Sequence, residues 1–280
     1  MQHIHRVAAM LVAVCFSVSA QAASGSSPDS VWFADEQSVY QIDTGANTVT
    51  LSIPLEKPRE LAIDAQDASL WAVTDRQLLK FDAYGKLLLQ IELQVLGLHE
   101  SEHLAADPYD GSLWLAGEKK FAHLNAQGQL LGKWTTSGSI EAIALSLDQT
   151  LWLLSKKQLA HYSAQGTLLA SQNLKGLVKE EPEFLAIDSV INRLWLAGEK
   201  QLLQFDPNNL KQPLLNIALS AETSGITLAP DSGTLWLMTK QNLIAYARNG
   251  AWVKTVDLKT ADFKMRGIKD PQRLVYNPAS

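Results

Sequence analysis

The chain has 280 residues, of which 46% are hydrophobic and 19% are charged, and its formal net charge is −5 at pH 7. A weakly acidic protein is poorly suited to the phosphate backbone of DNA or RNA, which argues against nucleic-acid binding. The only cysteine is Cys15, so the chain cannot form a disulfide within itself.

The first 22 residues have the pattern of a secretory signal peptide. Arg6 gives a basic start, Val7 to Val18 form an apolar core, and a small-x-small pattern follows. A retained anchor is the alternative, but the core is shorter than the roughly 18 residues that span a bilayer. A lipoprotein would use Cys15, yet the bulky valine before it fits that pattern badly. We therefore expect export, to the periplasm or medium, with no integral membrane segment after cleavage.

After the leader, the Ser-rich residues 23–30 are expected to form a flexible lead-in and residues 31–280 a single domain. The stretch from residue 59 to 93 shows how that domain is built. It contains four apolar runs separated by polar breaks: Leu61–Asp64, Leu70–Val73, Leu78–Phe81 and Leu87–Leu93. A turn sequence ending at Gly85 separates the last two runs. Four short strands joined by hairpins make one antiparallel sheet.

Six tryptophans measure the length of the repeat. They are Trp32, Trp71, Trp114, Trp152, Trp195 and Trp236, at intervals of 39, 43, 38, 43 and 41 residues. A period near 40 with four strands per unit is typical of a propeller blade. The large apolar rings suit packing between adjacent blades, and a stack of sugar-binding aromatic residues is the alternative use.

The sequence therefore predicts an all-β fold, a six-bladed β-propeller of four-stranded antiparallel blades. The competing fold is an array of paired helices, but a Gly, Asp or Asn break arrives about every ten residues, too often for helical stripes. The first blade lacks its innermost strand. We expect the C-terminal segment to supply it and close the ring, through either Phe263–Asp270 or Arg273–Asn277.

The stretch from Lys57 to Leu88 resembles NHL repeats and the six-bladed propellers related to them. The matching residues are Pro58, Arg59, Leu61–Asp64, Phe81, Asp82, Gly85 and Lys86. The other blades match in part, and the hairpin after Trp71 is shorter than in that family, where Asp75 only loosely mirrors the expected aspartate. The resemblance implies the fold, and propellers of this kind serve many functions.

Four of the predicted innermost strands begin with a carboxylate, 11 or 12 residues before the repeated tryptophan. They are Glu60, Glu102, Glu141 and Glu183. Around a ring, these groups would meet at the mouth of the central channel and raise one another's pKa unless a cation neutralised them. The functional interpretation is a site for a hard divalent cation or an amine, with His103 beside it. The alternative is a solvated acidic rim with Arg59 and Arg266 as counterions.

The same face should carry the short hairpins between second and third strands, whose basic residues predict a basic rim around the acidic centre. They are Arg76, Lys119, Lys120, Lys156, Lys157, Lys200 and Lys240. Such residues either keep the protein soluble or attract an anionic partner. Two long connections between blades, Gln94–Ser101 and Lys175–Pro182, and a third extension, Lys259–Gly267, are where binding specificity would reside.

The segment His99-Glu100-Ser101-Glu102-His103 matches the His-Glu-x-x-His zinc motif. That motif needs a helix, whereas the repeat places His103 directly before a strand, so we interpret the match as a coincidence in an inter-blade loop. A metal site that is not helical is the alternative. His123 and His161 occupy equivalent places in two blades, which favours a repeated structural role over catalysis.

The sequence contains no Gly-x-Ser-x-Gly motif, phosphate-binding glycine-rich loop or cysteine pair. We expect an exported, monomeric, non-enzymatic propeller that binds a protein or a small extracellular ligand without a cofactor. The alternative is a metal-dependent hydrolase or lactonase of the six-bladed kind, which would use a divalent cation held by some of Glu60, Glu102, His103, Glu141 and Glu183.

Overall fold

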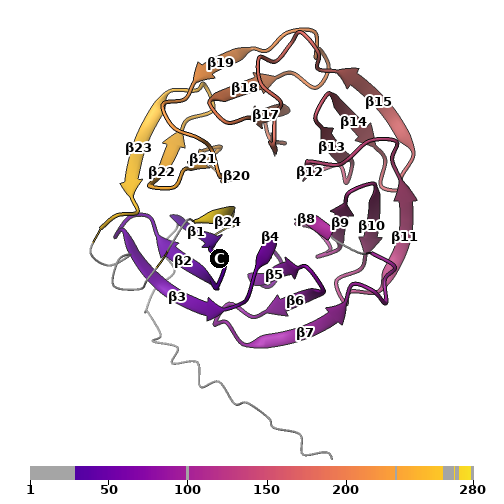
Figure 1. Ribbon diagram of the computed structural model, residues 1–280, viewed down its shortest axis with the longest axis vertical. Coiled ribbons are helices and arrows are strands. Elements are labelled where there is room, and N and C mark those ends of the chain that lie inside the picture. The colour runs from indigo at the N-terminus through magenta and orange to yellow at the C-terminus, as the bar shows by residue number, and fades with distance from the viewer. Residues whose placement is uncertain (1–28, 99–100, 231, 261–267, 269–270, 279–280) are drawn as a thin grey trace, which may run out of the picture.

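The computed structural model describes residues 29–98, 101–230, 232–260, 268 and 271–278. In these ranges the chain forms 24 β-strands and no helix, so the helical-array alternative is wrong. It follows that no described segment is a helix able to cross a membrane. The strands form six four-stranded antiparallel sheets around a central axis (Figure 1), which confirms the six-bladed β-propeller.

The blades are numbered along the chain, and in each the first strand named is the innermost. Blade 1 contains β24 (Gln272–Pro278), β1 (Asp29–Ala34), β2 (Ser38–Asp43) and β3 (Thr48–Pro54). Blade 2 contains β4 (Pro58–Asp64), β5 (Ser69–Thr74), β6 (Gln77–Phe81) and β7 (Leu87–Glu92). Blade 3 contains β8 (Ser101–Ala106), β9 (Leu113–Gly117), β10 (Lys120–Leu124) and β11 (Leu130–Thr135).

The remaining blades follow the same order without interruption. Blade 4 contains β12 (Ala142–Leu145), β13 (Leu151–Ser155), β14 (Gln158–Tyr162) and β15 (Leu168–Asn173). Blade 5 contains β16 (Phe184–Asp188), β17 (Arg193–Ala197), β18 (Gln201–Phe205) and β19 (Leu215–Ala218). Blade 6 contains β20 (Gly225–Leu228), β21 (Leu235–Met238), β22 (Asn242–Tyr246) and β23 (Trp252–Asp257).

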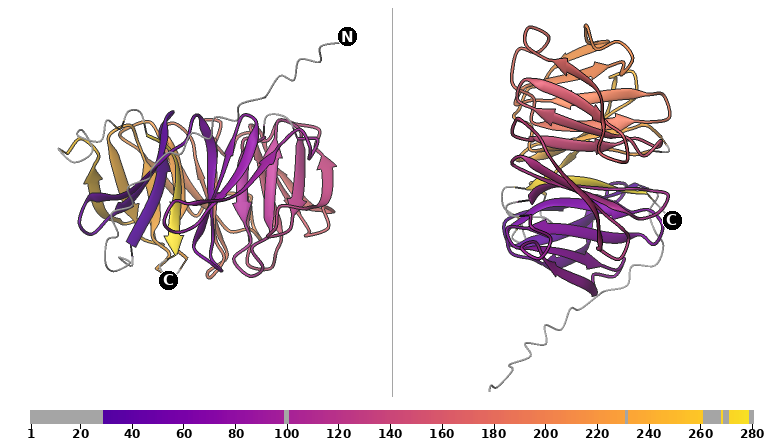
Figure 2. Two further views of the ribbon diagram at one scale, coloured as in Figure 1. Left: turned by 90° about the horizontal axis from the view of Figure 1, so that it is seen from below. Right: turned by 90° about the vertical axis from the view of Figure 1, so that its right-hand side faces the viewer.

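The ring is closed by β24, which pairs antiparallel with β1 and joins the two ends of the chain. Of the two candidate closing strands, the one at Arg273–Asn277 is therefore correct. Two bonds tie this strand to blade 6: the Tyr276 N–H donates to Thr227 Oγ1 at 2.9 Å, and Ser224 Oγ donates to the Pro271 carbonyl at 3.1 Å. The molecule is a flat disc with its strands running across the thickness (Figure 2).

The core lies between neighbouring blades and is built on the repeated tryptophans. Trp71 is fully buried and packs with Leu104 and Leu115 of blade 3, and Trp32 packs in the same way with Leu61 of blade 2. Because each sheet buries its faces only against its neighbours, a single blade could not be stable alone. The expected inter-blade role of the tryptophans is confirmed.

Glycine recurs in the hairpin between the third and fourth strands. Gly85 has φ of +83°, a region that side chains rarely adopt, and a Cβ there would lie 3.0 Å from Ile53 of blade 1. Gly128, Gly166 and Gly250 repeat the positive φ. At the other end of the chain, the predicted signal peptide lies outside the described residues, and β1 begins at Asp29, inside the segment expected to be a lead-in.

Candidate binding site at the channel mouth

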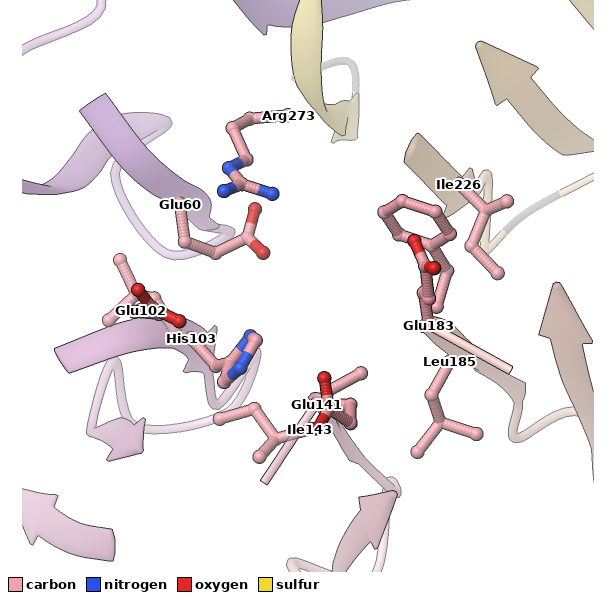
Figure 3. A pocket seen from close by; sticks show the side chains of 12 residues that line it. Glu60, Glu102, His103, Glu141, Ile143, Glu183, Leu185, Ile226 and Arg273 are labelled. Atoms are coloured by element: carbon pink, nitrogen blue, oxygen red, sulfur yellow. The ribbon is translucent and has the colours of Figure 1, made fainter. Parts of the chain in front are cut away.

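The six innermost strands all begin on one face of the disc, where they surround the mouth of the central channel. A cavity of about 210 Å³ lies there. Its lining residues are Glu60, Glu102, His103, Leu104, Glu141, Ala142, Ile143, Glu183, Phe184, Leu185, Ile226 and Arg273. The structure therefore brings all five sequence-predicted site residues to one cavity, and Figure 3 shows their side chains around it.

Strand pairing shows that the four glutamates occupy two layers. The tryptophan in each second strand pairs with a fixed position of the innermost strand, such as Ala62 for Trp71 and Ala105 for Trp114. Counting back two residues gives a deep ring: Glu60, His103, Ala142, Phe184, Gly225 and Arg273. Counting back three gives an outer rim: Arg59, Glu102, Glu141, Glu183, Ser224 and Gln272.

Local backbone irregularities set these side chains. In blades 2 and 3 the pairing skips one residue, Arg59 or Glu102, and in blade 1 it skips Arg273. Such β-bulges change the direction of a side chain and are common beside binding sites. In blades 4 and 5, the N–H groups of Glu141 and Glu183 instead donate to the second strand, 2.8 and 2.9 Å from the carbonyls of Leu154 and Ala197.

Glu60 is the most perturbed acid of the mouth. It lies in the deep ring, and burial raises its pKa to about 7, although the nearby Arg273 guanidinium and a hydrogen bond from the Leu61 N–H, 3.1 Å from Oε1, act in the opposite direction. At neutral pH this side chain is therefore close to half protonated. It can donate a hydrogen bond as well as accept one.

His103 stands next to Glu60 in the deep ring. Its Nε2 lies 3.1 Å from the Ile140 carbonyl, which can only accept, so Nε2 carries the proton and Nδ1 has the free lone pair. Burial lowers the pKa of His103 to about 4, and the Arg273 charge acts in the same direction. The imidazole is consequently neutral under physiological conditions.

The opposite side of the mouth is acidic at the rim and apolar below. Burial raises the pKa of Glu183, and the carboxylates of Glu199, Glu141 and Glu222 add to the effect. The predicted mutual effect of the ring carboxylates is thus present at Glu183. Phe184, Leu185 and Ile226 form the apolar wall beneath it.

Arg273 was missed as a site residue because the strand that carries it could not be placed from sequence. Its guanidinium lies beside Glu60 (Figure 3), and its Nε is buried without a hydrogen-bond partner. Of the two expected counterions, Arg59 is paired with Asp75 instead, and Arg266 lies outside the described residues. Counting back from Val275, which pairs with Trp32, would have found Arg273 once β24 was known.

The His-Glu-x-x-His segment is not a helix in the part that is described. Ser101, Glu102 and His103 belong to strand β8, so they are not in an inter-blade loop as expected, and His99 and Glu100 lie outside the described residues. Throughout the described part of the chain, no three His, Cys, Asp or Glu side chains are grouped closely enough to hold a metal ion.

His123 and His161 have the repeated structural position expected of them. Each imidazole stacks on the tryptophan of its own blade, Trp114 or Trp152, at ring distances of 4.3 and 4.1 Å. His161 Nε2 lies 2.7 Å from Thr150 Oγ1, and burial lowers the pKa of both histidines. The carboxylate of Asp148 bonds Thr150 and not the imidazole, so the order differs from a Ser-His-Asp triad.

The seven basic residues of the hairpins are exposed on the mouth face, but the rim that they form is mixed in charge. Asp75, Glu118 and Glu199 stand directly beside Arg76, Lys119 and Lys200 in the same hairpins. The basic rim expected from the sequence is therefore partly neutralised.

The long connections between blades are held to the ring. Leu96 and Leu98 are buried with the core of blades 2 and 3, and Glu180 Oε2 accepts a 2.9 Å hydrogen bond from the Lys200 N–H. These loops are therefore preformed around the mouth. Of the third extension, residues 261–267 lie outside the described part.

Comparisons with known proteins support the architecture. The chain is similar to the crystal structure of a protein of unknown function from Bacteroides caccae, with TM-score 0.68, 13% identity, and coverage of 90% of this chain and 99% of that chain. It is also similar to a chain in a nidogen/laminin complex, with TM-score 0.70, 13% identity, and coverage of 90% and 100%. No protein-family model and no curated protein matches the sequence. The chain thus has the fold of these propellers.

Proposed function

We propose that this chain is an exported, monomeric, non-catalytic propeller of the NHL type that binds a charged ligand at the mouth of its channel. The observation that carries the proposal is the convergence of Glu60, Glu102, His103, Glu141 and Glu183 on one cavity, with Arg273 among them. Concave sites with a few convergent polar groups and perturbed pKa values are the usual places where proteins bind ligands.

The composition of the wall supports binding over covalent catalysis. The cavity is lined by Glu, His, Arg, Phe, Leu, Ile and Ala, which include no serine, threonine, cysteine or lysine that could act as a nucleophile. The residue pattern also gives no support to the metal-dependent hydrolase, since the described acids and histidines form no three-membered ligand group.

The mouth face has room for a larger partner as well as a small ligand. The preformed loops at Leu93–Leu98 and Lys175–Pro182 surround the same face, and the similar propeller from the nidogen/laminin complex comes from a protein assembly. In this proposal a protein segment would reach the cavity through these loops. Export is checked by N-terminal sequencing of the secreted form, which should begin at Ala23.

Thermal unfolding with a panel of amines, amino acids, carboxylic acids, neutral sugars and inorganic cations tests the proposed function. We expect at least one charged compound to raise the Tm of the mature chain, and the effect to disappear in the double variant Glu141→Gln/Glu183→Gln. Glu118→Gln is the matched control, because Glu118 is exposed on the same face but does not line the cavity. An equal Tm rise in the double variant, or no rise with any compound, would contradict the proposal.

A further inference from the structure

The mouth contains a cation whose electrostatic demand the protein itself does not satisfy. Arg273 Nε is buried with no hydrogen-bond partner, and in the described chain no carboxylate lies at ion-pair distance from its guanidinium. An unpaired buried donor of this kind is costly, because it has lost water without gaining a partner. The residue also adopts φ of +56°, a conformation that non-glycine residues rarely adopt.

The two neighbours of Arg273 in the deep ring do not neutralise it. His103 is neutral, and its lone pair at Nδ1 accepts a hydrogen bond but carries no charge. Glu60 is close to half protonated at neutral pH and one of its oxygens already accepts from the Leu61 N–H. A ligand carboxylate could therefore accept from Arg273 and from protonated Glu60 together, which is the strong, charge-assisted kind of hydrogen bond.

The rim has the opposite preference. Glu102, Glu141 and Glu183 place three carboxylates around the outer part of the same cavity, and Glu199 and Glu222 act on Glu183 from the neighbouring loops. Lys156 is the cation that opposes them at Glu183, and it is exposed. This outer layer therefore attracts ammonium groups.

Between the two layers lies an apolar wall of limited size. Ile143, Leu185 and Ile226 offer contact for methylene groups, and Phe184 adds an aromatic face. The cavity of about 210 Å³ is smaller than the pockets of roughly 300–1,000 Å³ that bind drug-sized molecules. It therefore suits a small molecule with an anionic end, a short apolar stem and cationic groups.

We infer that the mouth binds a small amino acid with a second amino group, with its carboxylate on Arg273 and its ammonium groups among Glu102, Glu141 and Glu183. The three rim carboxylates outnumber the one guanidinium, so a ligand with more ammonium than carboxylate groups fits the charge balance better than a neutral zwitterion. The inference rests on the proposed function and adds the class of ligand to it.

Isothermal titration calorimetry of the mature chain with L-lysine, cadaverine and hexanoate tests the inference. Cadaverine lacks the carboxylate of lysine, and hexanoate lacks both amines. We expect lysine to bind at least about 10-fold more tightly than either, because each of the others loses a charge-assisted contact. This comparison uses the unaltered protein and does not depend on a variant that folds.

Variants then assign the two ends of the ligand. Arg273→Gln should reduce lysine affinity to about that of cadaverine while leaving cadaverine binding at least as tight, and Glu183→Gln should weaken both ligands. Glu118→Gln should change neither. Cadaverine binding as tightly as lysine would overturn the carboxylate contact and leave the proposed function standing. Failure of lysine and cadaverine to bind, with another panel compound stabilising the protein through Glu141 and Glu183, would overturn the inference alone.

Discussion

At the scale of single residues, the mouth is defined by two neighbouring groups whose pKa values are shifted in opposite directions. Glu60 is held toward its neutral acid form and His103 toward its neutral base form, and burial is the main cause for both. The groups that face them from adjacent strands are Arg273 of β24 and Glu102 and Arg59 at the rim. Their titrations should therefore be visible in the stability of the protein.

The two titrations have opposite effects on the free energy of unfolding. Between pH 4.5 and 6.5 the folded state holds a proton on Glu60 that the unfolded state releases, so this group makes stability fall as pH rises to about 7. The folded state lacks a proton on His103 that the unfolded state binds, so that group makes stability rise from pH 4 to 6.5. Each shift corresponds to at most about 3 kcal/mol, and the two nearly cancel.

Removing one group should uncover the slope of the other. We expect Glu60→Gln to become more stable as pH rises from 4.5 to 6.5, and His103→Gln to become less stable over the same interval. Urea unfolding at pH 4.5, 5.5 and 6.5 measures both, with Glu118→Gln as the control. The account of the deep ring is wrong if Glu60→Gln and His103→Gln show the same pH slope.

At the scale of elements, the closing strand β24 contributes both the stability of the ring and a part of the site. Leu274 is 5% exposed and packs with Trp236 and Met238 of blade 6 and Phe33 of blade 1. The neighbouring β20 has Gly225 where a Cβ would lie 3.2 Å from Leu274, so the two strands approach closely. The same strand carries Arg273 into the mouth.

Leu274→Ala should cost about 2–5 kcal/mol of stability, because it opens a cavity in the contact between the last blade and the first. Leu131→Ala is a suitable control, since Leu131 is 60% exposed on an outer strand and its loss should cost less than about 0.5 kcal/mol. Denaturant unfolding compares the two variants. Equal small losses would mean that the C-terminal segment does not close the ring in solution.

The sequence predicts the elements well because each blade repeats the same physical pattern. The runs at Leu61–Asp64 and Leu70–Val73 and the glycine at residue 85 are local signals, and the structure has strands and a turn at those places. What local signals could not supply was Arg273, whose position depends on pairing between residues at opposite ends of the chain. The difference in depth between Glu60 and Glu102 was also hidden, since it comes from β-bulges.

At the scale of the whole molecule, the two faces of the disc differ in chemistry. The mouth face carries the acidic cavity and the charged hairpins, whereas exposed apolar residues such as Tyr84, Leu131 and Trp252 lie in or just after the hairpins that lead to the outer strands. These hairpins lie at the opposite ends of the blades, because the strands of each blade alternate in direction. A small charged ligand should therefore enter from the mouth face.

The most direct test of the proposed mouth is a crystal structure of the mature chain grown with the best-binding charged ligand. The account predicts ligand density in the cavity between Arg273 and the carboxylates of Glu141 and Glu183, with Arg273 Nε donating to the ligand. Density confined to the opposite face, or a mouth in which Arg273 is paired with Glu60 and the cavity holds only water, would contradict it.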